Sequence, residues 1–208
     1  MSRRPVTFHC EGVQLEGVMH AVAPGEESAR CVVTHPHPLY GGSMDNNVVW
    51  ALCEELPRVG IGALCFNFRG VGGSTGRYSE GTGEAKDLAA AVSFCAEGFG
   101  GPVFVAGYSF GAYVACLAAE TDPGFSALAI VSPPVDMMDV AFPPPALMPL
   151  LVVAGDRDMF CSVERLRDAL QAGAVPQIIE GADHFWLGSE PDMAGAVAGF
   201  FLGLTEKE

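Results

Sequence analysis

The sequence predicts an α/β fold with a mainly parallel central sheet, helices on both faces and a single domain over residues 1–208. Three observations predict it. From residue 31 onward, short apolar runs alternate with longer helical stretches, as in strand–helix–strand units. Half of the residues are hydrophobic and only 17% are charged, which fits one substantial core without a linker. Polar residues suited to catalysis also follow several expected strands, where active-site loops of parallel sheets collect.

Each element rests on its local pattern. Residues 7–10 and 14–21 look like two antiparallel strands joined at Glu11-Gly12, and residues 31–34 form a third, apolar strand. Residues 47–59 are expected to form a helix, with Asp45 or Asn46 as candidate N-cap. The remaining expected strands are short and mostly apolar: 61–68, 103–106, 127–131, 150–154 and 176–179. The remaining expected helices, of which the first two are rich in alanine, are 84–97, 112–120, 163–172 and 191–202.

A G-x-S-x-G turn, Gly107-Tyr-Ser109-Phe-Gly111, joins an expected strand to an expected helix. Such a turn strains the serine backbone, and its glycines stand where a side chain would collide with the neighbouring strand or helix. The Ser109 hydroxyl then lies at the positive end of a helix, where developing negative charge is stabilised. Residues 72–76 match the same letters around Ser74, but they lie in a glycine-rich loop with no helix after them. We therefore interpret Ser109 as the nucleophile and Ser74 as a loop residue.

An acid and a base follow the last two expected strands. Asp158 comes shortly after the seventh expected strand, and His184 comes shortly after the eighth. The chain order is therefore Ser109, Asp158, His184, with each residue just beyond a strand. These residue types form a triad in which the histidine takes the serine proton and the aspartate orients the histidine.

This order, the turn around Ser109 and the strand–helix alternation resemble the α/β-hydrolase superfamily over nearly the whole chain. The segment His35-Pro-His-Pro-Leu-Tyr-Gly-Gly-Ser-Met-Asp-Asn46 resembles, more narrowly, a group of small lidless bacterial serine hydrolases akin to dienelactone hydrolase. The resemblance implies a catalytic triad and a hydrolytic reaction, and it implies no particular substrate. The connection between residues 131 and 150 is short and rich in proline, so we expect no cap domain.

The acid has three competitors in the sequence. Asp158 fits the Gly-x-x-Asp pattern of the family, and Asp156 is suited to bracing the same turn. Asp136 follows the preceding strand, a location that some hydrolases use, and Asp183 is adjacent to the base and would point elsewhere. We prefer Asp158, with Asp136 as its best rival.

Other histidines are weighed as rival bases or metal ligands. His9 and His20 lie on the amino-terminal strands, before the parallel sheet begins, and we discount them. His35 and His37 alternate as metal ligands can, but no third ligand accompanies them, and the intervening prolines fit a fixed loop better. We therefore expect no metal and no cofactor, with His184 as the base.

An oxyanion hole needs two backbone donors. Phe110, which follows the nucleophile, supplies one, and we prefer Leu39 over Tyr40 for the other because prolines 36 and 38 have no N–H. Arg69 is interpreted as a structural ion-pair partner of Asp87, in preference to a clamp for a substrate carboxylate. Apolar side chains near the catalytic loops predict an apolar substrate pocket. Its expected lining is Tyr40, Met44, Met137, Met138, Phe142, Phe160 and Trp186, with Phe110 beside them.

Composition excludes several classes of function. The net charge of −14 argues against a nucleic-acid partner, which needs clustered Lys and Arg. The longest apolar run, around residues 146–154, is too short to cross a bilayer, so we expect no membrane partner and no secretory signal. The seven cysteines are scattered and include no C-x-x-C pair, which predicts free thiols and a cytoplasmic location.

Together these observations predict a serine hydrolase, specifically a carboxylesterase acting on small to medium carboxylic esters through an acyl-enzyme. The partner is then a small-molecule ester, and the oligomeric state is not predicted. A thioesterase, a lactone hydrolase or an aminopeptidase of the same fold remains open. So does a non-catalytic binding protein, although such a protein has no physical need to keep all three triad residues.

Overall fold

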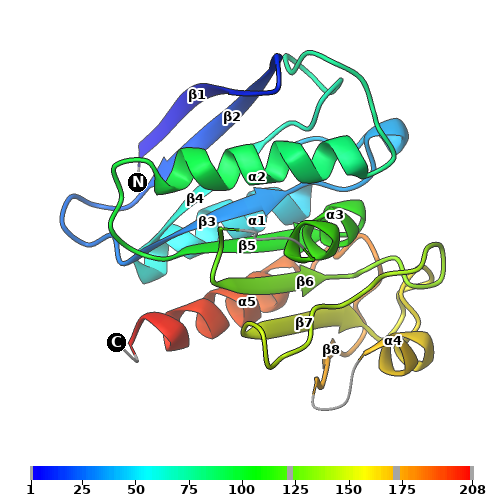
Figure 1. The fold of residues 1–208 in the computed structure, drawn as a ribbon. Coiled ribbons are helices and arrows are strands. Elements are labelled where there is room, and N and C mark those ends of the chain that lie inside the picture. The colour runs from blue at the N-terminus through cyan, green and yellow to red at the C-terminus, as the bar shows by residue number, and fades with distance from the viewer. Residues whose placement is uncertain (1, 121–123, 171–173, 207–208) are drawn as a thin grey trace.

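An eight-stranded sheet in the order β1-β2-β4-β3-β5-β6-β7-β8 runs through the computed structural model (Figure 1). The structure describes residues 2–120, 124–170 and 174–206. The strands are β1 (Ser2–Cys10), β2 (Val13–Ala21), β3 (Ala29–Thr34), β4 (Ile61–Phe66), β5 (Val103–Tyr108), β6 (Ala127–Val131), β7 (Leu150–Gly155) and β8 (Gln177–Ile179). β1 and β2 are antiparallel, β2 runs antiparallel to β4, and the pairings from β4 to β8 are parallel. The predicted fold class is confirmed.

Helices cover both faces of this sheet (Figure 1). They are α1 (Asn47–Glu55), α2 (Thr82–Ala96), α3 (Phe110–Ala119), α4 (Val163–Ala169) and α5 (Glu190–Thr205). Alternate strand residues enter different cores: Val32 of β3 belongs to the core beneath α2, α3 and α4, whereas Cys31 and Val33 belong to the core beneath α1 and α5. The parallel strands are therefore apolar on both faces, which is why they read as short continuous apolar runs.

The observed bounds differ from the expected ones where backbone chemistry interrupts a pattern. The helix expected over 47–59 ends at Glu55 and continues as a 3₁₀ turn, Leu56–Val59, because Pro57 has no N–H to donate. A second 3₁₀ turn, Pro38–Tyr40, lies in a loop for which no element was expected. The expected end of the helix over 163–172, residue 172, lies outside the described residues.

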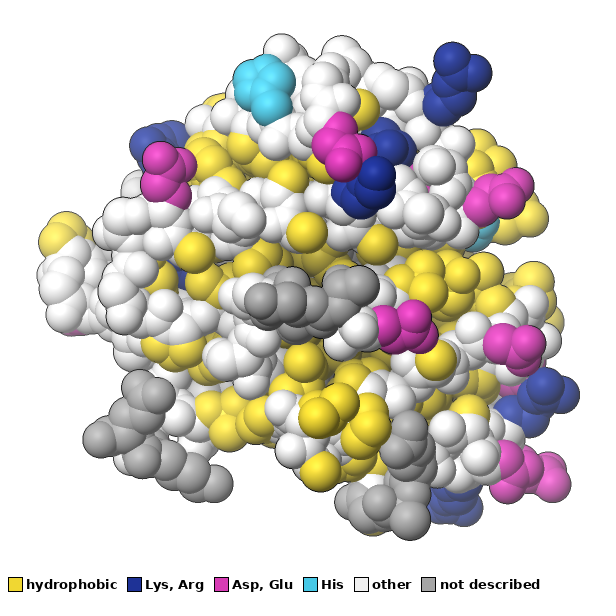
Figure 2. Space-filling model, viewed as in Figure 1, with side chains coloured by type: hydrophobic (Ala, Val, Ile, Leu, Met, Phe, Trp, Pro, Cys, Tyr) yellow, Lys and Arg dark blue, Asp and Glu magenta, His cyan; other side chains and the backbone are white. Residues whose placement is uncertain are grey.

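The connection between β6 and β7, residues 132–149, is fully described and holds neither helix nor strand. No cap domain therefore stands above the carboxyl ends of the parallel strands. Among the described residues, no helix has the length and apolar character needed to cross a bilayer. On the face shown in Figure 2, basic side chains lie interspersed with acidic ones around a band of hydrophobic side chains.

Candidate active site

The turn around Ser109 is a single residue between strand and helix. β5 ends at Tyr108 and α3 begins at Phe110, which leaves Ser109 with φ +54° and ψ −117°. Its N–H donates to the Val131 carbonyl at 3.0 Å, so the neighbouring strand holds this backbone in place. A non-glycine residue rarely adopts such a positive φ, and the surrounding structure has to impose it.

The two glycines of the motif are required by close backbone approach. A Cβ on Gly107 would lie 2.6 Å from the carbonyl oxygen of Gly111. A Cβ on Gly111 would lie 2.6 Å from Thr34 Oγ1 and 2.7 Å from the His35 carbonyl oxygen. Real Cβ atoms do not approach other atoms this closely, so α3 can lie against the ends of β3 and β5 only with glycine at both positions.

Ser109, His184 and Asp158 form a continuous hydrogen-bonded network. Ser109 Oγ lies 3.0 Å from His184 Nε2, and His184 Nδ1 lies 2.9 Å from each carboxylate oxygen of Asp158. Because an ionised carboxylate only accepts, Nδ1 carries the proton and Nε2 is free to accept from the serine hydroxyl. All three side chains are largely buried, with the serine 8% exposed. This is the geometry of a nucleophile, a general base and an orienting acid.

The environment of Asp158 keeps it ionised. Burial by itself raises the pKa of this carboxyl, but its interactions with His184 and a hydrogen bond from the Ser132 hydroxyl lower it. The amides of Phe160 and Cys161 also donate to Oδ1, at 2.9 Å and 3.0 Å. The stabilising hydrogen bonds prevail, and the pKa of Asp158 lies below its ordinary value.

The loop that carries His184 is held from both sides. The Tyr108 hydroxyl donates to the His184 carbonyl at 2.9 Å, and the Phe160 ring meets the imidazole edge-on with centroids 4.8 Å apart. A Cβ on Gly155 would collide with the backbone of Ala182, so this glycine lets the loop after β7 approach the loop after β8. These contacts bring Asp158 and His184 together although 26 residues separate them in sequence.

The rival aspartates each serve a turn. Asp136 accepts from the Ser162 amide at 2.6 Å and from the Ser162 hydroxyl at 3.0 Å, which fixes the start of α4. Asp156 accepts from the Gly181 amide at 2.7 Å. Asp183 accepts from the amides of the two residues that follow His184. Asp158 is thus the aspartate in contact with the His184 ring, as the sequence predicts.

Ser74 and Arg69 also have structural partners. The Ser74 hydroxyl donates to the Asn67 carbonyl at 2.6 Å and accepts from the Glu16 amide at 3.1 Å, so it braces its loop. Arg69 makes a two-pronged ion pair with the buried Asp87, with distances of 2.7 Å and 2.9 Å. The predicted Arg69–Asp87 pair is confirmed, and the guanidinium is engaged within the protein.

The amides near the nucleophile differ in whether they already have a hydrogen-bond partner. The N–H of Phe110 has no hydrogen-bond partner among the described residues, as is usual in the first turn of a helix. The Leu39 amide, however, donates to His37 Nδ1 at 3.2 Å, and the Tyr40 amide donates to the His37 carbonyl at 3.1 Å. Both amides weighed for the second donor are therefore used inside the Pro38–Tyr40 turn.

A third amide of this loop, that of His37, was not weighed from the sequence. Within the fully described loop 35–42 this amide has no hydrogen-bond partner. It stands between Pro36 and Pro38, and this flanking by two residues without N–H groups was the available signal. Because His37 Nδ1 accepts a hydrogen bond, its proton sits on Nε2, which lies 3.2 Å from the Tyr78 hydroxyl. Burial outweighs the opposing effect of Glu84 and lowers the pKa of His37, so its ring stays neutral.

The expected pocket residues differ in how far their side chains are buried. Phe160 touches the His184 ring, while Tyr40 and Met137 are largely exposed and Met44 is half-buried. Trp186 is fully buried beneath α5 and donates to the Ser132 hydroxyl at 3.0 Å, so it belongs to the core and not to a pocket wall.

Two further expected wall residues also need correction. Phe142 is buried in the core beneath α2, α3 and α4. Met138 lines a depression of about 370 Å³ together with Arg165 and Asp168 of α4, and no triad residue lines that depression. The prediction for these residues rested on nearness in sequence, which does not determine the direction of a side chain.

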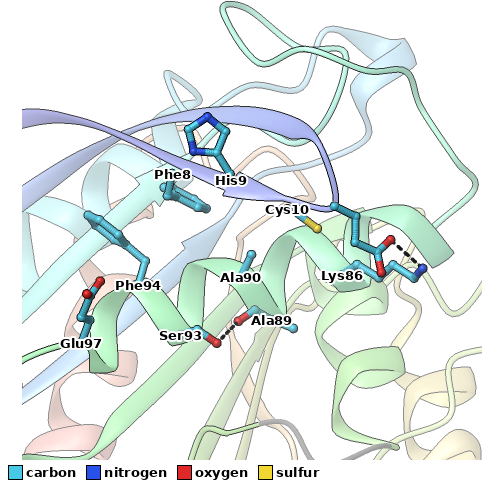
Figure 3. Close-up of a pocket in the computed structure, with 10 residues that line it drawn as sticks. Phe8, His9, Cys10, Lys86, Ala89, Ala90, Ser93, Phe94 and Glu97 are labelled. Carbon is cyan, nitrogen blue, oxygen red and sulfur yellow. Dashed lines mark hydrogen bonds and ion pairs between the residues drawn. The ribbon is translucent and has the colours of Figure 1, made fainter.

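The protein also has a surface groove away from the triad. It has a volume of about 740 Å³ and runs between β1 and α2, with Phe8 and Phe94 at one end and the Lys86–Glu11 ion pair at the other (Figure 3). None of the triad residues lines it. We therefore describe it as a surface groove outside the active site.

The sheet topology, the strained Ser109 and its contact with His184 and Asp158 define an α/β serine hydrolase without a lid. The chain belongs to the family described as serine aminopeptidase, S33, which matches residues 30–148. That match includes the His35–Asn46 segment and the nucleophile, and it ends before the acid and the base.

Several known proteins are similar over nearly the whole chain. An uncharacterized protein of Rickettsia prowazekii (strain Madrid E) is 31% identical over 202 residues, covering 91% of this chain and 84% of the relative. The structure of an alpha-beta serine hydrolase homologue from Coxiella burnetii is 30% identical, with a TM-score of 0.81 and coverage of 96% and 97%. A serine hydrolase without lid from Xanthomonas campestris is 29% identical, with a TM-score of 0.85 and coverage of 96% and 94%.

A more distant structure, Est1E from Butyrivibrio proteoclasticus, shares the fold. It is 18% identical, with a TM-score of 0.82, and the alignment covers 97% of this chain and 100% of that chain.

Proposed function

We propose that this protein is a serine carboxylesterase that cleaves small to medium carboxylic esters. The observation that carries the proposal is the hydrogen-bonded line from Ser109 Oγ through His184 to Asp158, with each step at 2.9–3.0 Å. A serine hydroxyl in this arrangement is activated for attack on a carbonyl carbon.

The chemistry follows from the positions of the protons. As Ser109 Oγ attacks the ester carbonyl, its proton passes to His184 Nε2, and Asp158 stabilises the imidazolium that forms. The imidazolium then protonates the leaving alcohol, which departs and leaves an acyl-enzyme. His184 next takes a proton from water, the hydroxide attacks the acyl carbon, and Ser109 is released with its proton restored.

We assign the oxyanion hole to the amides of Phe110 and His37. Neither amide has a partner within the described protein, and the strained backbone of Ser109 turns into α3 immediately before the first of them. Two unengaged N–H groups are what the negative oxygen of a tetrahedral intermediate requires.

An apolar rim supports esters as the substrate class. Exposed hydrophobic side chains stand in the loops that hold the triad, one or two residues from catalytic or oxyanion positions: Leu39, Met159, Phe185. With no cap above it, this rim leaves one side of a substrate in water and suits compact acyl groups. Est1E has been solved with ferulic acid bound, and a site of this fold that accepts a small aromatic acid agrees with this proposal.

The family description brings in an aminopeptidase as the competing activity. An aminopeptidase has to bind a substrate ammonium, for which a free carboxylate near the nucleophile is the natural partner. Asp156 and Asp183, which flank the acid and the base, both accept hydrogen bonds from the protein's own turns. This favours esters over aminoacyl amides. Thioesters and lactones use the same chemistry, and the resemblance of segment 35–46 to dienelactone hydrolase-like enzymes keeps lactones among the test substrates.

We also propose a reducing, cytoplasmic environment. All seven cysteines are free and buried, which is the usual state of thiols in that compartment. Mass spectrometry of the protein taken directly from its native cells, after rapid thiol alkylation, should find the cysteines reduced. Disulfides in freshly prepared protein would contradict this location.

Two assays test the esterase proposal. A fluorophosphonate probe, which needs an activated serine, should label the wild-type protein and the Ser74→Ala variant but not Ser109→Ala. A panel of p-nitrophenyl esters of rising chain length, run beside thioesters, lactones and aminoacyl amides, should give the highest kcat/KM for short to medium esters. Labelling without ester turnover, or a higher kcat/KM for aminoacyl amides, would overturn the assignment to carboxylesters.

A further inference from the structure

Three side chains with metal-binding atoms meet on the α1 side of the sheet, away from the strand ends that carry the triad. His20 lies on β2, Cys65 on β4 and Cys53 on α1. In the antiparallel β2–β4 pairing, Val18 stands opposite Cys65 and His20 stands opposite Ala63. Val18 and His20 are two residues apart, so His20 and Cys65 occupy the same face of the sheet, and α1 covers that face with Cys53.

The imidazole of His20 has a nitrogen with no partner. The His20 side chain is 2% exposed, and Nε2 is the buried side-chain polar atom without a hydrogen bond among the described residues. The other nitrogen, Nδ1, lies 3.6 Å from Glu54 Oε1. A carboxylate there favours the proton on Nδ1, which leaves the lone pair of Nε2 directed into the protein. Such a buried atom without a partner calls for an explanation, of which an ion is one.

The three ligand atoms have the spacing of an open coordination site. One nitrogen of His20 and the sulfurs of Cys53 and Cys65 all lie within 4.8 Å of one another. Zinc binds sulfur at about 2.3 Å and imidazole nitrogen at about 2.0 Å, so ligands around one ion stand roughly 3.5–4 Å apart. Small rotations of the side chains therefore close the observed cluster around an ion.

The net charge of the complex also suits a divalent ion. Two thiolates and a neutral imidazole make an uncharged complex with Zn²⁺, which is the form that tolerates burial. Glu54 stands behind the imidazole as the carboxylate of a carboxylate–histidine–zinc arrangement does.

We propose that His20, Cys53 and Cys65 bind a structural Zn²⁺ ion that ties β2 and β4 to α1. The fourth position falls to water or to the Val18 carbonyl, which lies 3.7 Å from Cys65 Sγ. The ion reaches the cluster past Glu54 and Trp50, both of which are in contact with solvent. Hydrolysis at Ser109 does not use this ion, so metal content and stability are the readouts, and the proposal stands independently of the esterase assignment.

The test compares zinc retention by matched variants. Wild-type protein is reduced, stripped with a chelator, exposed to Zn²⁺ or to Cu⁺ without oxygen, and freed of excess ion by gel filtration. We expect stoichiometric zinc on the wild type and a rise in Tm, since binding to the folded state alone stabilises it. The variants His20→Gln and Cys65→Ser should lose both effects. Cys95→Ala, which removes a buried thiol of α2 outside the cluster, should keep both.

A fluorescence titration tests the proposal even if the His20 and Cys65 variants fail to fold. Trp50 meets the His20 ring edge-on with centroids 5.9 Å apart, and the chain has only two tryptophans. In a Trp186→Phe background, zinc titration should therefore change Trp50 emission with a stoichiometric end point. Absence of zinc on the wild type, unchanged zinc on Cys65→Ser, or silent Trp50 emission at saturating zinc would overturn the proposal. Retention of Cu⁺ in place of Zn²⁺ would overturn the identity of the ion.

Discussion

The chain contains the same five-letter serine pattern twice, and the two copies have different structures. The Ser74 hydroxyl donates to the Asn67 carbonyl and accepts from the Glu16 amide, and these hydrogen bonds brace the loop around it. Around Ser109 the backbone is strained, the flanking glycines touch neighbouring elements, and the hydroxyl faces an imidazole. The difference teaches that a motif becomes a nucleophile through the strand before it, the helix after it and the base that other loops bring to it.

The largest effect should come from removing the two hydroxyls in turn. Ser109→Ala should lower kcat by a factor of about 10⁶, the size found when a triad nucleophile is removed. Ser74→Ala should leave kcat/KM nearly unchanged and lower the free energy of unfolding by about 1–3 kcal/mol, because it leaves buried partners unsatisfied. Steady-state kinetics and urea unfolding measure the two. Loss of activity in Ser74→Ala with activity kept in Ser109→Ala would reverse the comparison.

The second-largest effect should come from Asp158, the acid that orients the His184 base. Asp158→Asn should lower kcat by a factor of about 10⁴, because an amide cannot fix the same tautomer or stabilise the imidazolium. Asp136→Asn should lower kcat far less, since Asp136 binds the start of α4. Both variants should be assayed on the best ester of the panel. An equal loss in the two would mean that the contact between Asp158 and His184 is not the productive one.

The third effect concerns the glycines that distinguish the two copies. Gly111→Ala places a Cβ against Thr34 Oγ1 and the His35 carbonyl, so α3 has to move. We expect a loss in kcat of about 10²-fold, because a shift of about 1 Å misplaces the nucleophile. Gly199→Ala in α5, where a Cβ meets nothing within 4 Å, is the control and should raise stability slightly. Full activity in Gly111→Ala would show that the close approach is not needed.

The smallest effect is a pH dependence of stability. The folded-state pKa of Asp158 lies below its ordinary value of 3.8, so its stabilisation is present above that value and is lost as the pH falls through the folded-state pKa. Urea unfolding of wild type and Asp158→Asn should therefore differ most near neutral pH and converge in acid. The Ser74→Ala variant removes no charge. Its free energy of unfolding should therefore differ from that of wild type by the same amount over the whole pH range. A gap for Asp158→Asn that widens in acid would contradict the lowered pKa.

The sequence predicted much of the fold because hydrophobic periodicity reports burial directly. Short apolar strands such as Ile61–Phe66 and Val103–Tyr108 lie where they were expected, and their flanking loops hold Ser109, Asp158 and His184. The pattern around each triad residue is local, and the strand ends bring the residues together without further information.

What the sequence did not predict depends on contacts between distant elements. The Leu39 amide is engaged because the adjacent His37 ring turns back onto it, which spacing alone does not reveal. Trp186 and Phe142 are core residues because α5 and the other helices cover them. His20 was discounted as a base because it lies on an amino-terminal strand, and its neighbours Cys53 and Cys65 come from two other elements.

The connection between β6 and β7 holds neither helix nor strand, and this has a kinetic consequence. With no lid to close or open, no gating step precedes chemistry, and products leave directly into solvent. Turnover of soluble esters should then be limited by acylation or deacylation, so kcat should be insensitive to added viscogen. The rate should also follow ordinary saturation without a jump at the concentration where the ester forms micelles. The selectivity of such a site depends on the fixed shape of its rim and on the rate of bond breaking.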